Sequence, residues 1–288
     1  ATHERVLAIR GTNDGYDIAT DVISVAALGP TLNQGQYQSL RAKVQDWMAT
    51  GVLPRQFAVT GHSLGGFLAT GLALEFPSFV EHAYLYNAPG VGGLARRWSL
   101  DEIARAYHIT DGTFDPGKFT SVRAKPGSSL ISGLGNQPSP PILIEGEDKG
   151  GWLIGTNNHS MKFLVDSLAI HDAFSRLGDG AYESLASIGR IIRGSSDREL
   201  RKLEGALDAL RKTVTGGTIS STPEENREAL YENLYALTGS SAYANLASRA
   251  TLTPIASLGR EDIASTASGS LGSLVALRWL ASFRLGGV

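Results

Sequence analysis

Residues 57 to 66 read Phe57-Ala58-Val59-Thr60-Gly61-His62-Ser63-Leu64-Gly65-Gly66, an apolar and β-branched run followed by small residues around a serine. The segment from Gly61 to Gly65 fits G-x-S-x-G, the nucleophile elbow, in which a serine stands on a sharp turn from a strand to a helix. Glycines flank the serine because side chains at those positions would collide with the neighbouring strand and helix. Apolar residues at helical spacing follow until Phe76-Pro77, so a helix is expected after the turn.

Strands and helices alternate along the first 170 residues of the chain. Apolar runs predict strands at 5–9, 57–60, 82–86, 119–124 and 142–144, with helices at 37–50, after the elbow, at 100–107 and at 161–170. This alternation predicts an α/β fold with a mainly parallel sheet and helices on both faces. The active site of such a sheet lies beyond the carboxyl ends of its strands.

The chain after Asp172 has a different pattern. Helical periodicity covers 181–192, 197–214, 223–237 and 263–285, and no run there is typical of a strand. We therefore expect an α/β catalytic domain over residues 1–172 and a helical C-terminal region over residues 173–288.

Composition excludes several classes of function. The net charge is −2 and no basic run occurs, which argues against nucleic-acid binding. The longest apolar stretch, 271–283, contains Arg278 and is too short to span a membrane. Cysteine is absent, so disulfides and thiolate metal sites are excluded. The acids at 14, 17 and 21 are interpreted as turn and capping residues, so no metal or cofactor is expected.

A nucleophilic serine needs a histidine base. In this fold the chain order is serine, acid, histidine. His159 follows the last strand and precedes the last helix of the first domain, so it is the expected base. The other five histidines fit less well because they precede the elbow, point away from Ser63, lie at the opposite end of the sheet, or end a helix at the expected surface: His3, His62, His82, His108 and His171.

The oxyanion hole needs two hydrogen-bond donors. The backbone N–H of Leu64, directly after the nucleophile, is one. The second is expected from the loop after the first strand, where Thr12 stands, and its hydroxyl adds a further donor.

Three segments resemble class 3 lipases, the fungal-type α/β-hydrolases: Val6 to Thr12 with its Arg-Gly-Thr, Val59 to Gly66 with the elbow, and Tyr84 to Gly92 with its Asn-Ala-Pro-Gly-Val-Gly. The resemblance covers about residues 5–170. It implies an α/β-hydrolase in which Ser63 is the nucleophile, His159 the base, and Thr12 with Leu64 the oxyanion hole. It also implies carboxylic esters such as acylglycerols or phospholipids as substrates. These segments also resemble lipase-like domains of large bacterial secreted repeat proteins. That resemblance implies that the protein is secreted and is part of a longer chain.

The sequence departs from this family at two places. Few residues precede the Arg-Gly-Thr strand, so we expect a sheet that is shortened or that is completed by something outside this chain. The family acid follows the strand equivalent to 119–124, but here Lys125 to Ser129 contain no carboxylate. Glu145 is the candidate orienting group for His159. Alternatives for the same role are Glu147, Asp148, Asn87, Ser128 and Ser129.

Two functions from different classes therefore compete. One is a serine hydrolase acting on lipid or small esters, with transient contact to a lipid interface. The other is a catalytically degenerate hydrolase domain that serves as a binding or structural module in a larger protein. Residues 91–103 are a candidate lid, Ile131 and Leu134 a candidate acyl groove, and 271–283 either a core helix or a lipid-facing surface.

Overall fold

The computed structural model describes residues 5–11, 34–90, 115–125, 132, 135–147, 160–177, 183–195, 202–222, 226–247, 249–255, 269, 271–272, 275–276 and 281–286. The chain divides into two compact units. The first, here the sheet unit, comprises residues 1–143 and 149–161, and the second, here the helical unit, comprises residues 144–148 and 162–288. The division differs from the expected boundary at residue 172, because the helix that begins at Met161 contributes nearly all of its residues to the helical unit.

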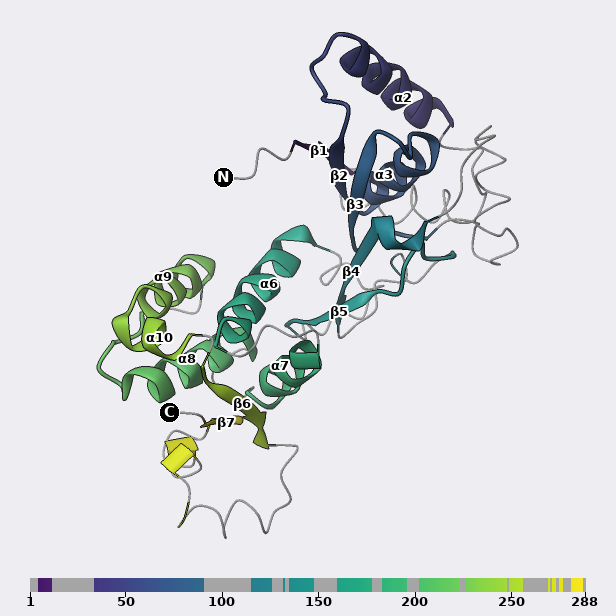
Figure 1. The fold of residues 1–288 in the computed structure, drawn as a ribbon. Helices are drawn as coiled ribbons and strands as arrows, with labels where there is room; N and C mark the ends of the chain where they lie inside the picture. Colours follow the sequence, from purple (N-terminus) through teal and green to yellow (C-terminus); the bar gives the residue numbers. More distant parts are fainter. Residues whose placement is uncertain are drawn as a thin grey trace. The chain divides into compact units, whose positions relative to one another are not determined.

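A five-stranded, mainly parallel sheet organises the first part of the chain, with strand order β1-β2-β3-β4-β5 (Figure 1). The strands are β1 (Val6–Ile9), β2 (Phe57–His62), β3 (Val80–Tyr86), β4 (Phe119–Lys125) and β5 (Ile142–Glu145). The pairs β1–β2, β2–β3 and β3–β4 are parallel. The five strands expected from sequence are therefore present, and the α/β class is confirmed.

Two helices cover one face of this sheet. The helix α3 (Leu64–Glu75) packs on β1, β2 and β3, and α2 (Gln34–Ala49) packs on α3 (Figure 1). The helix α3 is apolar all round and eleven of its residues are buried, as a helix between a sheet and a second layer must be. The core of the sheet unit lies between these layers and contains Val44, Phe57, Val59, Leu72 and Leu85.

The helical unit contains α6 (Met161–Ser175), α7 (Glu183–Gly194), α8 (Lys202–Thr215), α9 (Arg227–Thr238) and α10 (Ser241–Leu246). Its core gathers buried side chains from all five helices, including Phe174, Ile191, Leu210, Leu237 and Tyr243. The rings of Phe174 and Phe283 meet edge to face, with centroids 5.5 Å apart. The helical unit therefore has a hydrophobic core of its own.

The prediction that no strand follows residue 172 was wrong. Strands β6 (Thr251–Pro254) and β7 (Phe283–Gly286) form an antiparallel pair. The helix expected over 263–285 is also wrong at its end, because Phe283 and Leu285 belong to β7 and are buried. Residues 271–272 and 275–276 are helical, and Leu271 is 75% exposed rather than part of a core.

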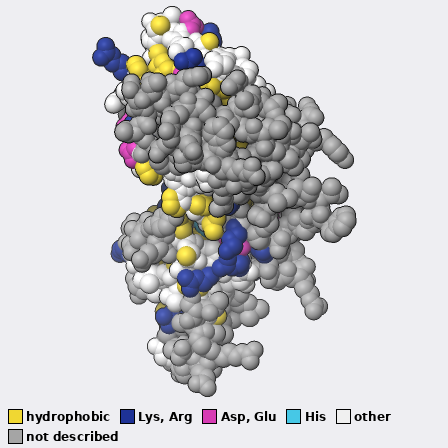
Figure 2. Space-filling view, turned by 90° about the vertical axis from the view of Figure 1, so that its right-hand side faces the viewer, with side chains coloured by type: hydrophobic (Ala, Val, Ile, Leu, Met, Phe, Trp, Pro, Cys, Tyr) yellow, Lys and Arg dark blue, Asp and Glu magenta, His cyan; other side chains and the backbone are white. Residues whose placement is uncertain are grey.

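Large hydrophobic side chains that reach the surface come from separate elements of both units: Val6, Val52, Leu143, Met161, Tyr235 and Leu271. Figure 2 shows hydrophobic, basic and uncharged side chains interspersed in the described part of one face. Among the helices that the structure describes, none is both long and apolar enough to span a bilayer.

Candidate active site

Ser63 stands at the turn from β2 to α3 with an unusual backbone conformation. Its φ is 56° and its ψ is −127°, a region that residues with a Cβ rarely adopt and that costs on the order of 1–3 kcal/mol. Its N–H donates to the carbonyl of Tyr86 at 3.0 Å, which ties the turn to the end of β3. Ser63 occupies the N-cap position of α3, yet its hydroxyl does not cap the helix. The turn is therefore strained and buried, and its serine side chain has no capping function.

The glycines of the motif stand where there is no space for a side chain. A Cβ at Gly61 would lie 2.2 Å from the carbonyl oxygen of Gly65, and a Cβ at Gly65 would lie 2.2 Å from the carbonyl oxygen of Ile9. A Cβ at Gly66 would lie 2.5 Å from the Cβ of Ala88. Two of these contacts are with backbone, which cannot move aside. The steric explanation of the G-x-S-x-G pattern is thus confirmed.

Ser63 lies directly before the N-terminus of α3. Leu64 and Gly65 begin this helix, and the helix dipole gives its N-terminus partial positive charge. Gly11, two residues after the end of β1, approaches this point. A Cβ at Gly11 would lie 3.6 Å from the backbone nitrogen of Leu64. The chain that leads into Thr12 therefore reaches the predicted oxyanion position, and Thr12 itself lies outside the described residues.

Several of the predicted site residues lie outside the described residues. They are the predicted base His159, the candidate orienting groups Asp148, Ser128 and Ser129, the candidate lid at 91–103, and Ile131 and Leu134 of the candidate acyl groove. Among the described residues, the structure thus brings together Ser63, Leu64 and Gly11 in the sheet unit. Of the candidate orienting groups it describes Asn87, Glu145 and Glu147.

Asn87 has a structural role at the carboxyl ends of β3 and β4. Its φ is 45°, and it is 1% exposed. Its N–H donates to the carbonyl of Val122, and its Oδ1 accepts from the N–H of Ala124, both at 2.9 Å. The side chain thus joins the two strands where their regular pairing ends, beside the elbow.

Glu145 and Glu147 both bind other groups. The Oε2 of Glu145 accepts from Nη1 of Arg193 at 2.8 Å, and the Glu145 side chain is 3% exposed. The carboxylate of Glu147 accepts from the backbone N–H groups of Lys202 and Leu203, at 3.2 and 2.7 Å. Glu147 therefore caps α8, where the helix dipole favours a negative charge.

The sequence matches no protein-family model, and no curated protein matches it significantly. Among the described residues, no cluster of three or more histidine, aspartate or glutamate side chains is placed to hold a metal ion.

His171 is buried, which corrects the expectation that it lies at the surface. It is 2% exposed, and its Nε2 donates to the carbonyl oxygen of Glu145 at 3.1 Å. Burial lowers the pKa of His171 to about 4, and the hydrogen bond to Glu145 opposes this effect only in part. The imidazole is therefore neutral at pH 7. The sequence signal that was missed is its spacing from Ile170 and Phe174, which places all three on the buried face of α6.

His82 and Asp115 both lie at the amino-terminal side of the sheet, and for His82 this is the position that the sequence predicted. His82 pairs in register with Ala58 near the start of β2, and its Nε2 lies 2.7 Å from the hydroxyl of Thr120. Asp115 caps the short 3-10 helix that precedes β4 by accepting from the N–H of Gly117. Both have local structural partners away from the elbow.

Proposed function

We propose that this protein is a serine hydrolase of the α/β-hydrolase type that cleaves carboxylic esters of lipids. The observation that carries the proposal is the backbone of Ser63, with φ 56° and ψ −127°, on a turn whose flanking glycines have no space for side chains. Strain of this kind persists only where the surrounding structure enforces it, and it concentrates at functional sites. In a nucleophile elbow the strain is what presents the serine hydroxyl apart from the helix that follows.

The proposed reaction assigns one role to each residue. Ser63 attacks the ester carbonyl, and His159 takes its proton and returns it to the leaving alcohol. The N–H of Leu64 and the Thr12 region stabilise the oxyanion, for which the N-terminus of α3 supplies a favourable field. Water then hydrolyses the acyl-enzyme, and the carboxylic acid is released. The three segments that resemble class 3 lipases support lipid esters as substrates and a secreted parent protein.

A second candidate is a degenerate hydrolase domain used for binding. The observation that favours it concerns the triad acid. The described residues at the carboxyl end of β4 include no carboxylate, and Asn87, Glu145 and Glu147 have the partners given above. Loss of the acid costs turnover by a factor on the order of 10^4 in serine hydrolases that retain the serine and the histidine.

The hydrolysis of a chromogenic acyl ester tests the proposal. We expect the wild-type chain to hydrolyse the ester and Ser63→Ala to reduce the rate to that of buffer. Ser39→Ala is the matched control, because Ser39 is an exposed helical serine whose hydroxyl donates to the carbonyl of Gly35. Equal rates for wild type and Ser63→Ala would refute the hydrolase, and no activity in a folded wild-type chain would favour the binding module.

A further inference from the structure

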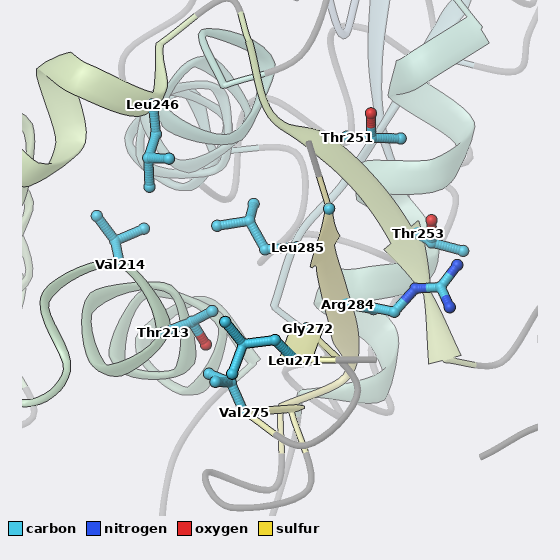
Figure 3. Close-up of a pocket in the computed structure, with 11 residues that line it drawn as sticks. Thr213, Val214, Leu246, Thr251, Thr253, Leu271, Gly272, Val275, Arg284 and Leu285 are labelled. Atoms are coloured by element: carbon cyan, nitrogen blue, oxygen red, sulfur yellow. The ribbon is translucent and has the colours of Figure 1, made fainter. Parts of the chain in front are cut away.

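The helical unit contains a pocket of about 530 Å³ beside the β6–β7 pair (Figure 3). Thr253 and Arg284 stand opposite each other in this pair and project from one face, and Leu285 projects from the other. Figure 3 shows Leu285 on the side of Val214 and Leu246. Arg284 is directed away from these aliphatic side chains. The polar and the aliphatic lining residues therefore do not meet around one ligand.

In the sheet unit, one peptide group connects the nucleophile turn to the neighbouring strands. It is the peptide group between Tyr86 and Asn87, at the carboxyl end of β3. Its carbonyl oxygen accepts from the N–H of Ser63 at 3.0 Å, and its own N–H donates to the carbonyl of Val122 on β4 at 2.9 Å. The position of the Ser63 backbone therefore depends on how firmly this peptide group is held against β4.

The side chain of Asn87 makes a hydrogen bond that a regular strand makes with its backbone. In a parallel pair, one residue donates its N–H to the neighbouring strand and accepts with its carbonyl from the residue two positions further along that strand. Here the N–H of Asn87 donates to Val122, and the N–H of Ala124 donates to Oδ1 of Asn87 at 2.9 Å. The side-chain oxygen thus stands where a backbone carbonyl would, and it attaches β4 beyond Tyr86 and Val122, the last pair of the register.

The backbone of Asn87 explains why an asparagine stands at this position. Its φ is 45°, in the left-handed region where asparagine is enriched among residues that have a Cβ. The residue that follows contacts the first turn of α3, since a Cβ at Gly66 would lie 2.5 Å from the Cβ of Ala88. Asn87 and Ala124 are both buried, so water does not replace the bond between them.

We propose that Asn87 is a positioning residue for the nucleophile. Its amide oxygen holds the Tyr86–Asn87 peptide group against β4, and this peptide group holds the N–H of Ser63 and thereby the direction of the serine side chain. The inference rests on the proposed hydrolase, because it assigns Asn87 to the reactivity of Ser63. A displacement of about 1 Å at a reacting group costs on the order of 100-fold in rate, so a small shift of the turn is measurable as a change in that reactivity.

The rate constant for fluorophosphonate labelling of Ser63 tests the proposal in chains shown to be folded by circular dichroism. Asn87→Gly removes the amide but keeps a residue that adopts positive φ, and we expect labelling to be about tenfold slower. Asn87→Asp keeps an oxygen that accepts from Ala124, so it should label within about threefold of wild type. Asn226→Gly is the matched control and should label at the wild-type rate. Asn226 also accepts from a backbone N–H, that of Ala229, but it caps α9 in the helical unit.

Hydrogen exchange of the Ser63 amide gives a second measurement that does not need activity. This N–H is bound to the carbonyl of Tyr86, so Asn87→Gly should exchange it faster than wild type and Asn226→Gly do. Asn87→Asp should restore the protection. If the folded wild-type chain is not labelled, the proposed hydrolase fails, and the exchange of Ser63 still shows whether Asn87 holds the turn.

Three results would overturn the inference. They are labelling of a folded Asn87→Gly chain at the wild-type rate, labelling of Asn87→Asp as slow as that of Asn87→Gly, and unchanged exchange of the Ser63 amide in Asn87→Gly. If Asn87→Gly does not fold, Asn87→Ser takes its place in both measurements. The serine side chain is too short to reach the N–H of Ala124, so this variant should also slow the labelling and speed the exchange.

Discussion

Gly65, the second residue of α3, lies directly against Ile9, the last residue of β1. A Cβ at residue 65 would lie 2.2 Å from the carbonyl oxygen of Ile9 and 3.0 Å from the backbone nitrogen of Gly11. This close approach holds the N-terminus of α3 between β1 and β2. It also brings Gly11 close to the backbone of Leu64. The second glycine of the motif thus joins the nucleophile turn to the strand that leads into the predicted oxyanion loop.

Gly65→Ala should destabilise the chain by about 3 kcal/mol, because an inserted methyl group would overlap with backbone on β1. Gly35→Ala is the matched control. Gly35 is an exposed residue of α2 with nothing within 4 Å of its Cβ position, so alanine should be neutral or stabilise by up to about 1 kcal/mol. Chemical denaturation of both variants measures the difference. Equal unfolding midpoints for the two would contradict the packing described for the turn.

Ser63→Gly should be more stable than Ser63→Ala by about 1 kcal/mol. Both variants lack the hydroxyl, but only glycine adopts φ 56° and ψ −127° without strain, and this gain exceeds the greater freedom of glycine in the unfolded chain. Thermal unfolding of the pair, followed by circular dichroism, gives the order. If the alanine variant is equally or more stable, the backbone of Ser63 is not strained.

Stability should fall as pH decreases from about 6.5 to about 4 because of His171. Its folded pKa of about 4 lies below the ordinary 6.5, so the unfolded chain binds more protons in this range. The contribution is complete above pH 6.5 and is lost as the pH falls, on the order of 3 kcal/mol in total. Urea unfolding of wild type and of His171→Gln at several pH values isolates the contribution of His171 to the free energy of unfolding. If the unfolding free energy of His171→Gln depends on pH as steeply as that of wild type, His171 is already charged in the folded state.

Glu145→Gln should affect stability more than turnover. The carboxylate of Glu145 is buried and binds Arg193, so loss of its charge weakens this pair by about 1–3 kcal/mol. Arg193→Gln is the comparison, because it breaks the same pair from its exposed partner. We expect ester hydrolysis within tenfold of wild type for both. A loss near 10^4 in kcat for Glu145→Gln alone would instead make Glu145 the orienting group of His159.

Much of the sheet unit could be predicted from local sequence. The elbow, the five strands and the helix after Ser63 follow from glycine placement and from apolar runs of strand length. The position of Ser63 relative to Gly11 could not be predicted from local patterns, because it depends on the packing of β1 against α3.

The helical unit was less predictable for three physical reasons. Strand β7 is short and ends a long apolar stretch, so its residues fit a helical period equally well. Its partner β6 ends at Pro254, and proline inside a run argues against a strand. The hydrogen bond of the His171 ring goes to the carbonyl of Glu145, which is 26 residues earlier in the chain. Such long-range pairings leave no local signal.

Reaction with a fluorophosphonate shows whether Ser63 is an activated nucleophile, because this probe bonds only to a serine whose hydroxyl is activated by a base and an oxyanion hole. The labelled chain is digested, and the modified peptide is identified by mass spectrometry. We predict a single modified residue, Ser63, and no labelling of Ser63→Ala. A folded wild-type chain that remains unlabelled, or that is labelled at another serine, would contradict it.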